Sequence, residues 1–424
     1  MKTTSAPAHK KGKTFYGWYI LAVCFLTVFF ALGFSYSPRS LCMAIITEDM
    51  GIPRSLYAVG ESIRFITKAV VDVMFGTLII KFGARKLLSL GFASLICATL
   101  IHAFATNVVM LYFGSFFMGM GLAWTTTTIV GHLVENWFTG NTGTIMGVIL
   151  ASNGLGGAVA TQFIKRIISL DTVIAGWRLC YMLIALALAI VGIIVLLVVR
   201  NRPEEMGLTP LDAKIASNKK AVAELREGLP YSVIKKKPYF YVGLVGIFCT
   251  GLVLQAIYGV GSAHMKDCGV DFSIVANTLS VSSLFLMISK TSTGFIYDKF
   301  GLRFTMLVCS GCAIIAIFSL AFVSNSFMAY LYCILISFGL PLETIVLLLI
   351  AKDLFGGQSY ARITGLFVAV NTFGYAVGVP LINIYYDLTG TYRPIMIVLG
   401  IVLAVIAFTM QLVITAARRD SQHI

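Results

Sequence analysis

Twelve long apolar runs, separated by polar loops, constrain this chain of 424 residues more than any other feature of its sequence. A helix needs about 20 mostly apolar residues to cross the hydrocarbon layer of a membrane. In lipid, only helices and closed barrels satisfy their own backbone hydrogen bonds, and runs of this length are typical of helices. The sequence therefore predicts an all-α membrane protein with twelve transmembrane helices. The runs are 15–46, 55–80, 87–106, 108–134, 143–168, 177–199, 239–263, 273–296, 303–323, 327–351, 360–386 and 393–416.

The positive charges are distributed unevenly over this topology. The formal net charge is +14, and a basic patch on a soluble module would suggest a nucleic-acid partner. If both termini are cytoplasmic, 22 of the 32 Lys and Arg residues lie on the cytoplasmic side, six lie outside and four lie within the runs. This bias is the positive-inside pattern of membrane proteins. We therefore expect a multi-pass protein of the cytoplasmic (inner) membrane, with both termini inside and no nucleic-acid partner.

An internal repeat with an offset of 218 residues divides the chain into two halves. The offset relates Asp49 to Asp267, Asn153 to Asn371 and many glycines to one another. Parallel repeats of this kind place a transporter's binding site between the two halves, near the middle of the membrane. We therefore predict two pseudo-symmetric six-helix bundles. They are 1–199 with a cytoplasmic N-tail and 239–424 with a cytoplasmic C-tail, joined by the polar cytoplasmic linker 200–238.

The most similar repeat segments, Gly76–Arg85 and Gly294–Arg303, resemble the loop signature of the major facilitator superfamily. The resemblance covers nearly the whole chain and implies the major facilitator fold. It also implies a cytoplasmic gate formed by Gly76, Gly83, Arg85, Gly294, Asp298, Gly301 and Arg303. Ile80 stands where the first copy of the signature would carry its acidic residue. Phe15–Tyr19 and Arg202–Pro210 are similar to the monocarboxylate porter and oxalate:formate antiporter branches.

Charged residues inside the membrane are functional candidates, because each costs about 2.5–3.5 kcal/mol to insert. Glu61, Arg64, Lys68 and Asp72 fall in a stripe roughly 80° wide on the second predicted helix. One interpretation makes Arg64 and Lys68 substrate-binding residues and gives Asp72 a role in proton coupling. The other interpretation is a packing ladder, because the spacing also permits ion pairs between neighbouring turns of the same helix.

Lys290 occupies the repeat position equivalent to Asp72 and has no carboxylate within one helical turn. In the families that the chain resembles, a basic residue at this point, usually arginine, is implicated in binding the substrate carboxylate, which implies that role for Lys290. Lysine presents a point charge, whereas arginine can hold a carboxylate through two parallel bonds. The alternative for Lys290 is a structural role, bonding to carbonyl groups of the fifth helix.

Further polar residues interrupt the apolar runs. Glu343, which follows Pro341, could carry a proton or balance a buried cation. Arg39 could admit an anion or extend to the outer membrane interface. The remaining candidates could line the site or serve in packing: Tyr36, Trp124, Thr125, Gln255, Tyr258 and Asn371.

These features together predict a secondary active transporter of small organic anions, either mono- or dicarboxylates. Transport would proceed by alternating access, as proton symport or as anion exchange. The chain carries no Walker motif, haem-attachment motif or catalytic-triad spacing, so we expect no enzyme activity, no cofactor and no metal site. We also expect a monomer. The alternatives are proton-coupled efflux of amphipathic compounds and a transport-like membrane sensor.

Overall fold

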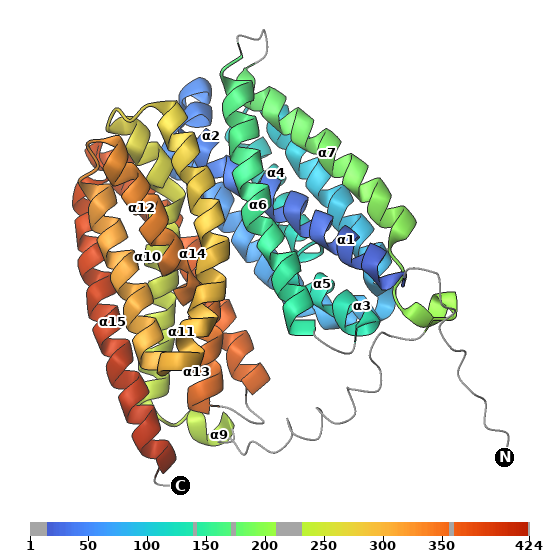
Figure 1. The fold of residues 1–424 in the computed structure, drawn as a ribbon. Helices are drawn as coiled ribbons and strands as arrows, with labels where there is room; N and C mark the ends of the chain where they lie inside the picture. Colours follow the sequence, from blue (N-terminus) through green and yellow to red (C-terminus); the bar gives the residue numbers. More distant parts are fainter. Residues whose placement is uncertain (1–14, 139–141, 171–174, 209–230, 356–359, 423–424) are drawn as a thin grey trace, which may run out of the picture.

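The computed structural model describes residues 15–138, 142–170, 175–208, 231–355 and 360–422, and the regular elements in these ranges are helical. Two groups of helices follow one another along the chain (Figure 1). The first group comprises α1 (Gly17–Val28), a π-helical turn (Phe29–Phe34), α2 (Ser35–Met50), α3 (Arg54–Ala103), α4 (Val108–Ala123), α5 (Thr127–Trp137), α6 (Thr142–Ile168), α7 (Gly176–Val198) and a 3₁₀ turn (Pro203–Met206). The second comprises α9 (Tyr231–Ile234), α10 (Pro238–Asp267), α11 (Phe272–Ala321), α12 (Ser326–Gly339), the 3₁₀ turn η3 (Leu340–Glu343), α13 (Ile345–Phe355), α14 (Tyr360–Thr389) and α15 (Arg393–Gln422).

Two of these elements, α3 and α11, each join two membrane crossings at one glycine. Gly83 has φ 74° and ψ 161°, and Gly301, its repeat equivalent, has φ 77° and ψ 176°. This backbone region is open almost only to glycine, because a β-carbon would clash with the main chain. The two glycines therefore let a crossing end and the next begin without a longer loop.

Ten segments of the described chain are long and apolar enough to cross a membrane. One of them, α11, contains two of the predicted crossings. The first half of α3 does not qualify by apolarity, because it carries the four charged residues of the stripe. When these two halves are counted, the described helices account for all twelve predicted crossings.

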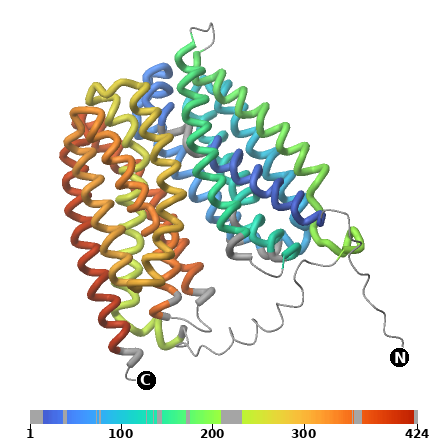
Figure 2. The backbone as a smooth tube through the Cα atoms, in the orientation of Figure 1, coloured from blue at the N-terminus to red at the C-terminus, as the bar shows by residue number. Residues whose placement is uncertain are grey.

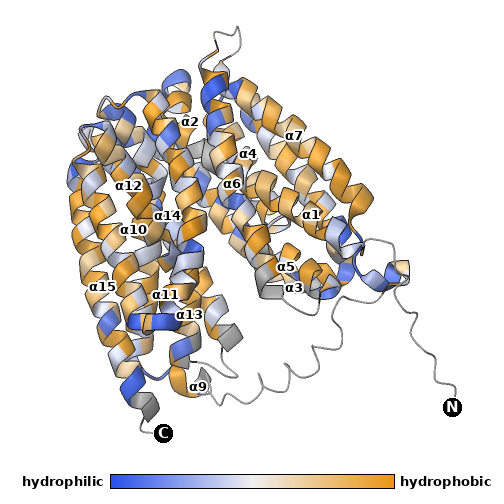
Figure 3. Cartoon of the chain, in the orientation of Figure 1, coloured by the Kyte–Doolittle hydropathy of each residue, from blue (hydrophilic) through white to orange (hydrophobic). Residues whose placement is uncertain are grey.

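The outer surfaces of the helices are apolar. On α7, Leu186, Ile190 and Ile193 are 54–59% exposed, whereas Leu188 and Val191 are buried. An apolar residue on the exposed face of a helix has no partner in water, but it has one in lipid. Apolar colour covers most of the helices in Figure 3, and polar colour gathers towards their ends. The distribution is that of a bundle surrounded by hydrocarbon.

The two groups are referred to below as the N-bundle and the C-bundle. We call the end of the bundles at which α15 ends the terminal side, and the opposite end, where α2 ends, the distal side. Between the bundles α3 packs against α14, α6 against α11 and α2 against α10. In Figures 1 and 2 the bundles come together on the distal side and diverge towards the terminal side.

Candidate functional site

Two crossings are broken near their middle, at equivalent positions of the repeat. The first break separates α4 from α5 and the second separates α12 from α13. Thr126 (φ −113°, ψ −152°) and Thr344 (φ −121°, ψ −75°), which are 218 residues apart, are both non-helical. Both breaks fall inside runs that the sequence predicts as continuous helices, 108–134 and 327–351, so neither break was predicted. Broken helices leave backbone polar groups free near the middle of the membrane, and transporters use such points for binding.

The second break positions Glu343 among polar groups from two other helices. Glu343 lies at the end of η3 and is 6% exposed. The amide Nε2 of Gln255 on α10 donates to its Oε2 at 3.2 Å. Asn371 on α14 donates from Nδ2 to the backbone oxygen of Glu343 at 3.3 Å and to the hydroxyl of Tyr375 at 2.6 Å. Three of the predicted residues therefore form one buried polar cluster in the C-bundle.

The charged stripe on α3 forms ion pairs within the helix. Arg64 pairs with Glu61, and Lys68 Nζ lies 2.5 Å from Asp72 Oδ2. The same side of α3 turns towards α14, because the ring of Phe65 packs against that of Tyr375 with centroids 5.3 Å apart. Lys68 and Asp72 follow Phe65 by three and seven residues and share its face. The stripe therefore lies along the seam between the bundles.

A cavity between the bundles contains one of these pairs. It encloses about 40 Å³, which is room for a few water molecules. An organic solute would enter it only if the bundles moved apart. Its walls combine a guanidinium, a carboxylate, an amide and aromatic rings from both bundles. They are formed by Met43, Tyr57, Ala58, Glu61, Arg64, Phe65, Gln255, Tyr258, Gly259 and Val379. Predicted residues Arg64, Gln255 and Tyr258 therefore share one cavity.

Lys290 lies on the other seam, between α6 and α11. The helices approach so closely that a β-carbon on Gly154 would lie 2.6 Å from the backbone oxygen of Ser283 and 3.2 Å from Cβ of Met287. Lys290 follows these residues of α11 by seven and three positions, so it shares the face turned towards α6. Its side chain is half-buried. Within the described residues, it has no ion-pair or hydrogen-bond partner.

The other predicted lining residues differ in how they are placed. Thr125 lies in the break after α4, is fully buried and donates back to the Gly121 carbonyl of α4 at 2.9 Å, which occupies its hydroxyl. Trp124 is half-buried, and its Nε1 has no hydrogen-bond partner among the described residues. The backbone of Tyr36 and Arg39 belongs to α2, but their side chains lie outside the described part of the chain.

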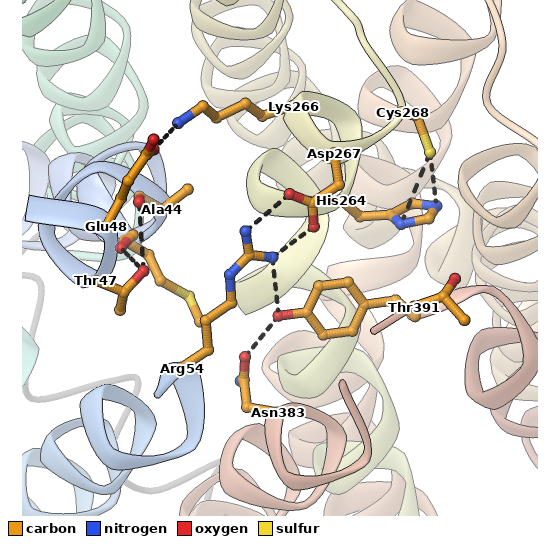
Figure 4. Close-up of polar contacts among 12 residues, drawn as sticks. Ala44, Thr47, Glu48, Arg54, His264, Lys266, Asp267, Cys268, Asn383 and Thr391 are labelled. Atoms are coloured by element: carbon orange, nitrogen blue, oxygen red, sulfur yellow. Dashed lines mark hydrogen bonds and ion pairs between the residues drawn. The ribbon is translucent and has the colours of Figure 1, made fainter. Parts of the chain in front are cut away.

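The distal side is closed by an arginine, one of the six cations that the predicted topology places outside the membrane. Arg54, at the start of α3, holds both carboxylate oxygens of Asp267, at 2.5 and 2.8 Å, across the bundle boundary (Figure 4). Its guanidinium also stacks on Tyr386 at 4.3 Å and donates to the hydroxyl of Tyr392 at 3.4 Å. Burial raises the pKa of Tyr392 and keeps it a neutral hydrogen-bond partner. Asp387 accepts the backbone N–H of Arg54 at 3.2 Å.

A second ion pair crosses the same boundary. Lys266 Nζ lies 2.7 Å from Glu48 Oε2 (Figure 4). The hydrogen bond and the positive charge of Lys266 lower the pKa of Glu48. Sequence alone offered one signal, which is that Glu48 and Lys266 lie at equivalent repeat positions with opposite charges.

The predicted gate residues lie on the terminal side. Arg85 donates through Nε and Nη2 to the carbonyl of Leu196, at 3.0 and 2.6 Å, and anchors α3 to α7. Arg303 donates to the hydroxyl of Thr415 on α15 at 2.9 Å. Asp298 is exposed, with no ion pair among the described residues. Gly76 lies in α3 and Gly294 in α11. The motif arginines therefore tie helices within a bundle on the side where the bundles diverge.

The described residues contain no group of three or more His, Cys, Asp or Glu side chains that could hold a metal ion. The interactions that the site offers to a solute are electrostatic. The site has cations and carboxylates on the two seams, a cavity that both bundles line and, among the described residues, ion pairs that join the bundles on the distal side. Such an arrangement can bind a charged solute and release it when the closure changes sides.

Comparison with known proteins agrees with this geometry. The Major Facilitator Superfamily profile matches residues 18–379. The sialic acid transporter NanX of Escherichia coli (strain K12) is 20% identical over 65% of this chain and 64% of its own length, so the match covers under two thirds of that relative. Monocarboxylate transporter 2 of Homo sapiens is 22% identical over 92% of this chain and 84% of its own.

Solved structures show the same fold. The nucleoside transporter NupG aligns with a TM-score of 0.72 and 14% identity, covering 95% of this chain and 99% of that one. A bacterial homologue of the human lysosomal transporter Spinster, inward-facing and unoccupied, aligns with a TM-score of 0.73 and 15% identity, covering 96% and 99%. The predicted family and fold are confirmed, and this multi-pass membrane protein belongs to the major facilitator superfamily.

Proposed function

We propose that the chain is a secondary active transporter of small organic anions, and that its substrates are carboxylates. The observation that carries the proposal is Lys290, a cation on the interbundle face with no acidic partner among the described residues. Holding an unpaired cation within a membrane is costly, so it is retained where function requires it. An anionic substrate supplies the missing partner.

The charges on the seams support this choice. Two cations of α3 have carboxylate partners in the same helix, Arg64 with Glu61 and Lys68 with Asp72. Among the described residues, Lys290 has no carboxylate partner and Glu343 has no cationic partner. If Glu343 binds a proton, the membrane interior gains one positive charge, which one carboxylate neutralises. Proton symport of a monocarboxylate would then move no net charge, whereas anion exchange would keep Glu343 unchanged.

Two relatives add support by their names, which denote organic acids: a monocarboxylate transporter and a sialic acid transporter. The chain has lysine at position 290, where the families that it resembles usually have arginine. Lysine cannot form two parallel hydrogen bonds to a carboxylate. We therefore expect recognition through Lys290 to depend on charge more than on carboxylate geometry, with Arg64 and the rings of the cavity adding shape.

The two ends of the seams support alternating access. The ion pairs of Arg54 and Lys266 close the distal side, and the bundles diverge on the terminal side. We take residues 1–199 and 239–424 as the two moving bodies of a monomer, tethered by 200–238. The excess of Lys and Arg on the terminal side favours a cytoplasmic position for that side and for both termini. The solute would then leave or enter the cytoplasm in the described conformation.

Uptake into proteoliposomes tests the proposal. Purified protein would be assayed with radiolabelled mono- and dicarboxylates, with and without a pH gradient or an internal counter-anion. Lys290→Gln should abolish uptake of the preferred carboxylate, whereas Lys236→Gln, which removes an exposed terminal-side cation outside the gate signature, should leave it unchanged. Undiminished uptake by Lys290→Gln, or no carboxylate uptake by the wild type, would reject the proposal.

A second candidate function is proton-coupled efflux of amphipathic compounds. It is favoured by the aromatic wall of the cavity, where Tyr57, Phe65 and Tyr258 surround the Arg64–Glu61 pair. Expression in a drug-sensitive host separates the two candidates. Resistance that disappears with Glu343→Gln would favour efflux, whereas unchanged susceptibility together with carboxylate uptake would exclude it.

A further inference from the structure

Gln255 lies between two parts of the site that the proposed function treats separately. Its side chain, on α10, is 8% exposed. Its Nε2 donates to Oε2 of Glu343 at 3.2 Å. The same residue lines the interbundle cavity together with Arg64 and Tyr258. One side chain therefore contacts the candidate proton carrier and forms part of the wall facing the candidate substrate.

We propose that Gln255 is a positioning residue that transmits the protonation state of Glu343 to the interbundle cavity. The inference rests on the proposed function, because it assumes that Glu343 exchanges a proton while an anion occupies the cavity. It adds a physical link between the two events.

The link follows from the chemistry of an amide, which carries a donor group at one end and an acceptor at the other. An ionised Glu343 only accepts hydrogen bonds, so it holds the NH₂ group of Gln255. A protonated Glu343 carries an O–H that needs an acceptor, and the amide oxygen supplies it once the amide turns over. The NH₂ group is then released from Glu343 and becomes available to an anion in the cavity. The step requires one proton from water to the carboxylate and breaks no other covalent bond.

The surroundings favour a response by Gln255 rather than by Glu343 itself. Asn371 on α14 holds the backbone at Glu343 and donates to Tyr375, whose hydroxyl is in turn hydrogen-bonded to the Glu343 side chain. Two residues of α14 therefore fix Glu343, and Gln255 is its side-chain partner from α10. A change of protonation is therefore met most easily by the amide that can rotate about its own side-chain bonds.

The charged and titratable groups that face this cluster come from several helices. From α3 they are Tyr57, Glu61 and Arg64, which line the cavity. Tyr258 faces it from α10, and Tyr375 from α14. Arg64 is paired with Glu61, and the Gln255 amide is a second polar group that an incoming carboxylate meets in the wall of the cavity.

Infrared difference spectroscopy of the full-length protein in lipid, recorded between acid and alkaline pH, tests the link without requiring transport. The C=O band of protonated Glu343 is identified by its loss in Glu343→Gln. In Gln255→Leu the acid loses its acceptor, and the band should move to higher frequency. Thr250→Val is the matched control, because Thr250 lies on the same helix and donates to the Gly246 carbonyl at 2.8 Å; its band should not move. An unmoved band in Gln255→Leu, or no Glu343 band in the wild type, would overturn the proposal.

Carboxylate affinity gives a second readout that a merely structural role would not reproduce. A hydrogen bond to a charged group contributes enough for about a tenfold change in affinity. Gln255→Leu should therefore bind the preferred carboxylate about tenfold more weakly at acid pH and almost normally at alkaline pH. An equal loss at both pH values would contradict the relay. If the wild type binds no carboxylate, the proposed function fails, whereas a shifted infrared band still supports the link between Gln255 and Glu343.

Discussion

Glu48 and Lys266 occupy equivalent positions of the two repeats and form an ion pair with each other, with Nζ 2.7 Å from Oε2. Their separation of 218 residues equals the repeat offset. Two positions related by a pseudo-twofold axis can touch only close to that axis. The ion pair therefore marks where the axis passes through the distal closure, and it joins the bundles at the point about which they are symmetric.

The next pair of equivalent residues has diverged. Asp49 accepts Nε1 of Trp177 at 3.0 Å within the N-bundle, whereas Asp267 accepts Arg54 across the boundary. The two halves therefore use the same acidic position differently. One copy fixes a bundle internally, and the other joins the two bundles.

Exchanging the charges of Glu48 and Lys266, the pair at the pseudo-twofold axis, gives the first prediction. Glu48→Lys places two cations face to face and should loosen the distal closure, and Lys266→Glu should do the same with two anions. The double variant restores an ion pair in the opposite sense, so its closure should match that of the wild type. Hydrogen–deuterium exchange at the end of α2 measures the effect. The prediction would be contradicted if hydrogen–deuterium exchange at the end of α2 were as fast in the double variant as in either single variant.

The pH dependence of this pair is the second prediction. Lys266 lowers the pKa of Glu48. The stabilisation of the distal closure by this pair is therefore fully present at any pH above the usual titration range of a glutamate carboxyl, including neutral pH. It is lost as the pH falls through the lowered pKa. The protection of the amides at the end of α2, expressed relative to intrinsic exchange at each pH, should therefore fall in acid. Lys266→Met removes the ion pair, so protection in this variant should be low at every pH and the step should disappear. A step at the same pH as in the wild type would argue against the assignment.

Arg54 carries the third prediction, because it makes more of the distal contacts than the Lys266 pair. Its side chain is 13% exposed, and that of Asp267 is 26% exposed. Arg54→Gln should shift the equilibrium towards distal opening by about tenfold, which corresponds to ~1.4 kcal/mol for a lost charged hydrogen-bonding partner. The reporter is Met43→Cys in the cavity wall, labelled by an impermeant thiol reagent from the distal side.

The control for this measurement is Arg393→Gln. Arg393 is also a distal arginine, but it stacks on Phe322 of its own bundle at 4.5 Å. Its loss should leave the labelling of Met43→Cys unchanged. Equal labelling in both variants would mean that Arg54 does not hold the closure.

The sequence predicted those features that depend on short-range spacing or on the repeat. The crossings follow from apolar length, and the Arg64–Glu61 and Lys68–Asp72 pairs follow from spacings of three and four residues on one helix. The contact of Arg54 with Asp267 could not be predicted, because it joins residues 213 positions apart and depends on how the two bundles dock.

The breaks in α4–α5 and α12–α13 were missed for a different reason. Apolar residues lie close on both sides of each break, so a count of apolar residues gives one continuous run at each. Pro341 was a signal for the second break, since proline cannot donate a backbone hydrogen bond. The equivalent residue in the first half is Ala123, and there the signal was the β-branched run from Thr125 to Thr128.

The motif glycines give the fourth prediction. Gly301→Ala should destabilise the protein by about 1–3 kcal/mol, since φ 77° with ψ 176° is strained for any residue with a β-carbon. Gly83→Ala should cost at least as much, because the added carbon would also lie 3.0 Å from Asn201 Oδ1. Gly294→Ala is the helical control with open space around it and should be neutral or stabilising. Thermal unfolding in detergent compares them, and equal Tm values in all three would refute the argument.

The last prediction decides between the two interpretations of the stripe on α3, using Lys68 and Asp72. Removing Lys68 alone leaves the Asp72 carboxylate without its partner in the membrane, so Lys68→Leu should lower Tm. Replacing both, in Lys68→Leu with Asp72→Leu, removes both charges and should restore Tm, because a neutral pair has no charge to desolvate. If the pair is only a packing ladder, this stable double variant transports the carboxylate as the wild type does. We expect instead that it folds normally but takes up the carboxylate with at least tenfold lower kcat/KM, because Lys68 lies on the seam face turned towards α14. Normal uptake by the double variant would assign Lys68 and Asp72 to packing and leave Lys290 as the cation proposed to bind the substrate.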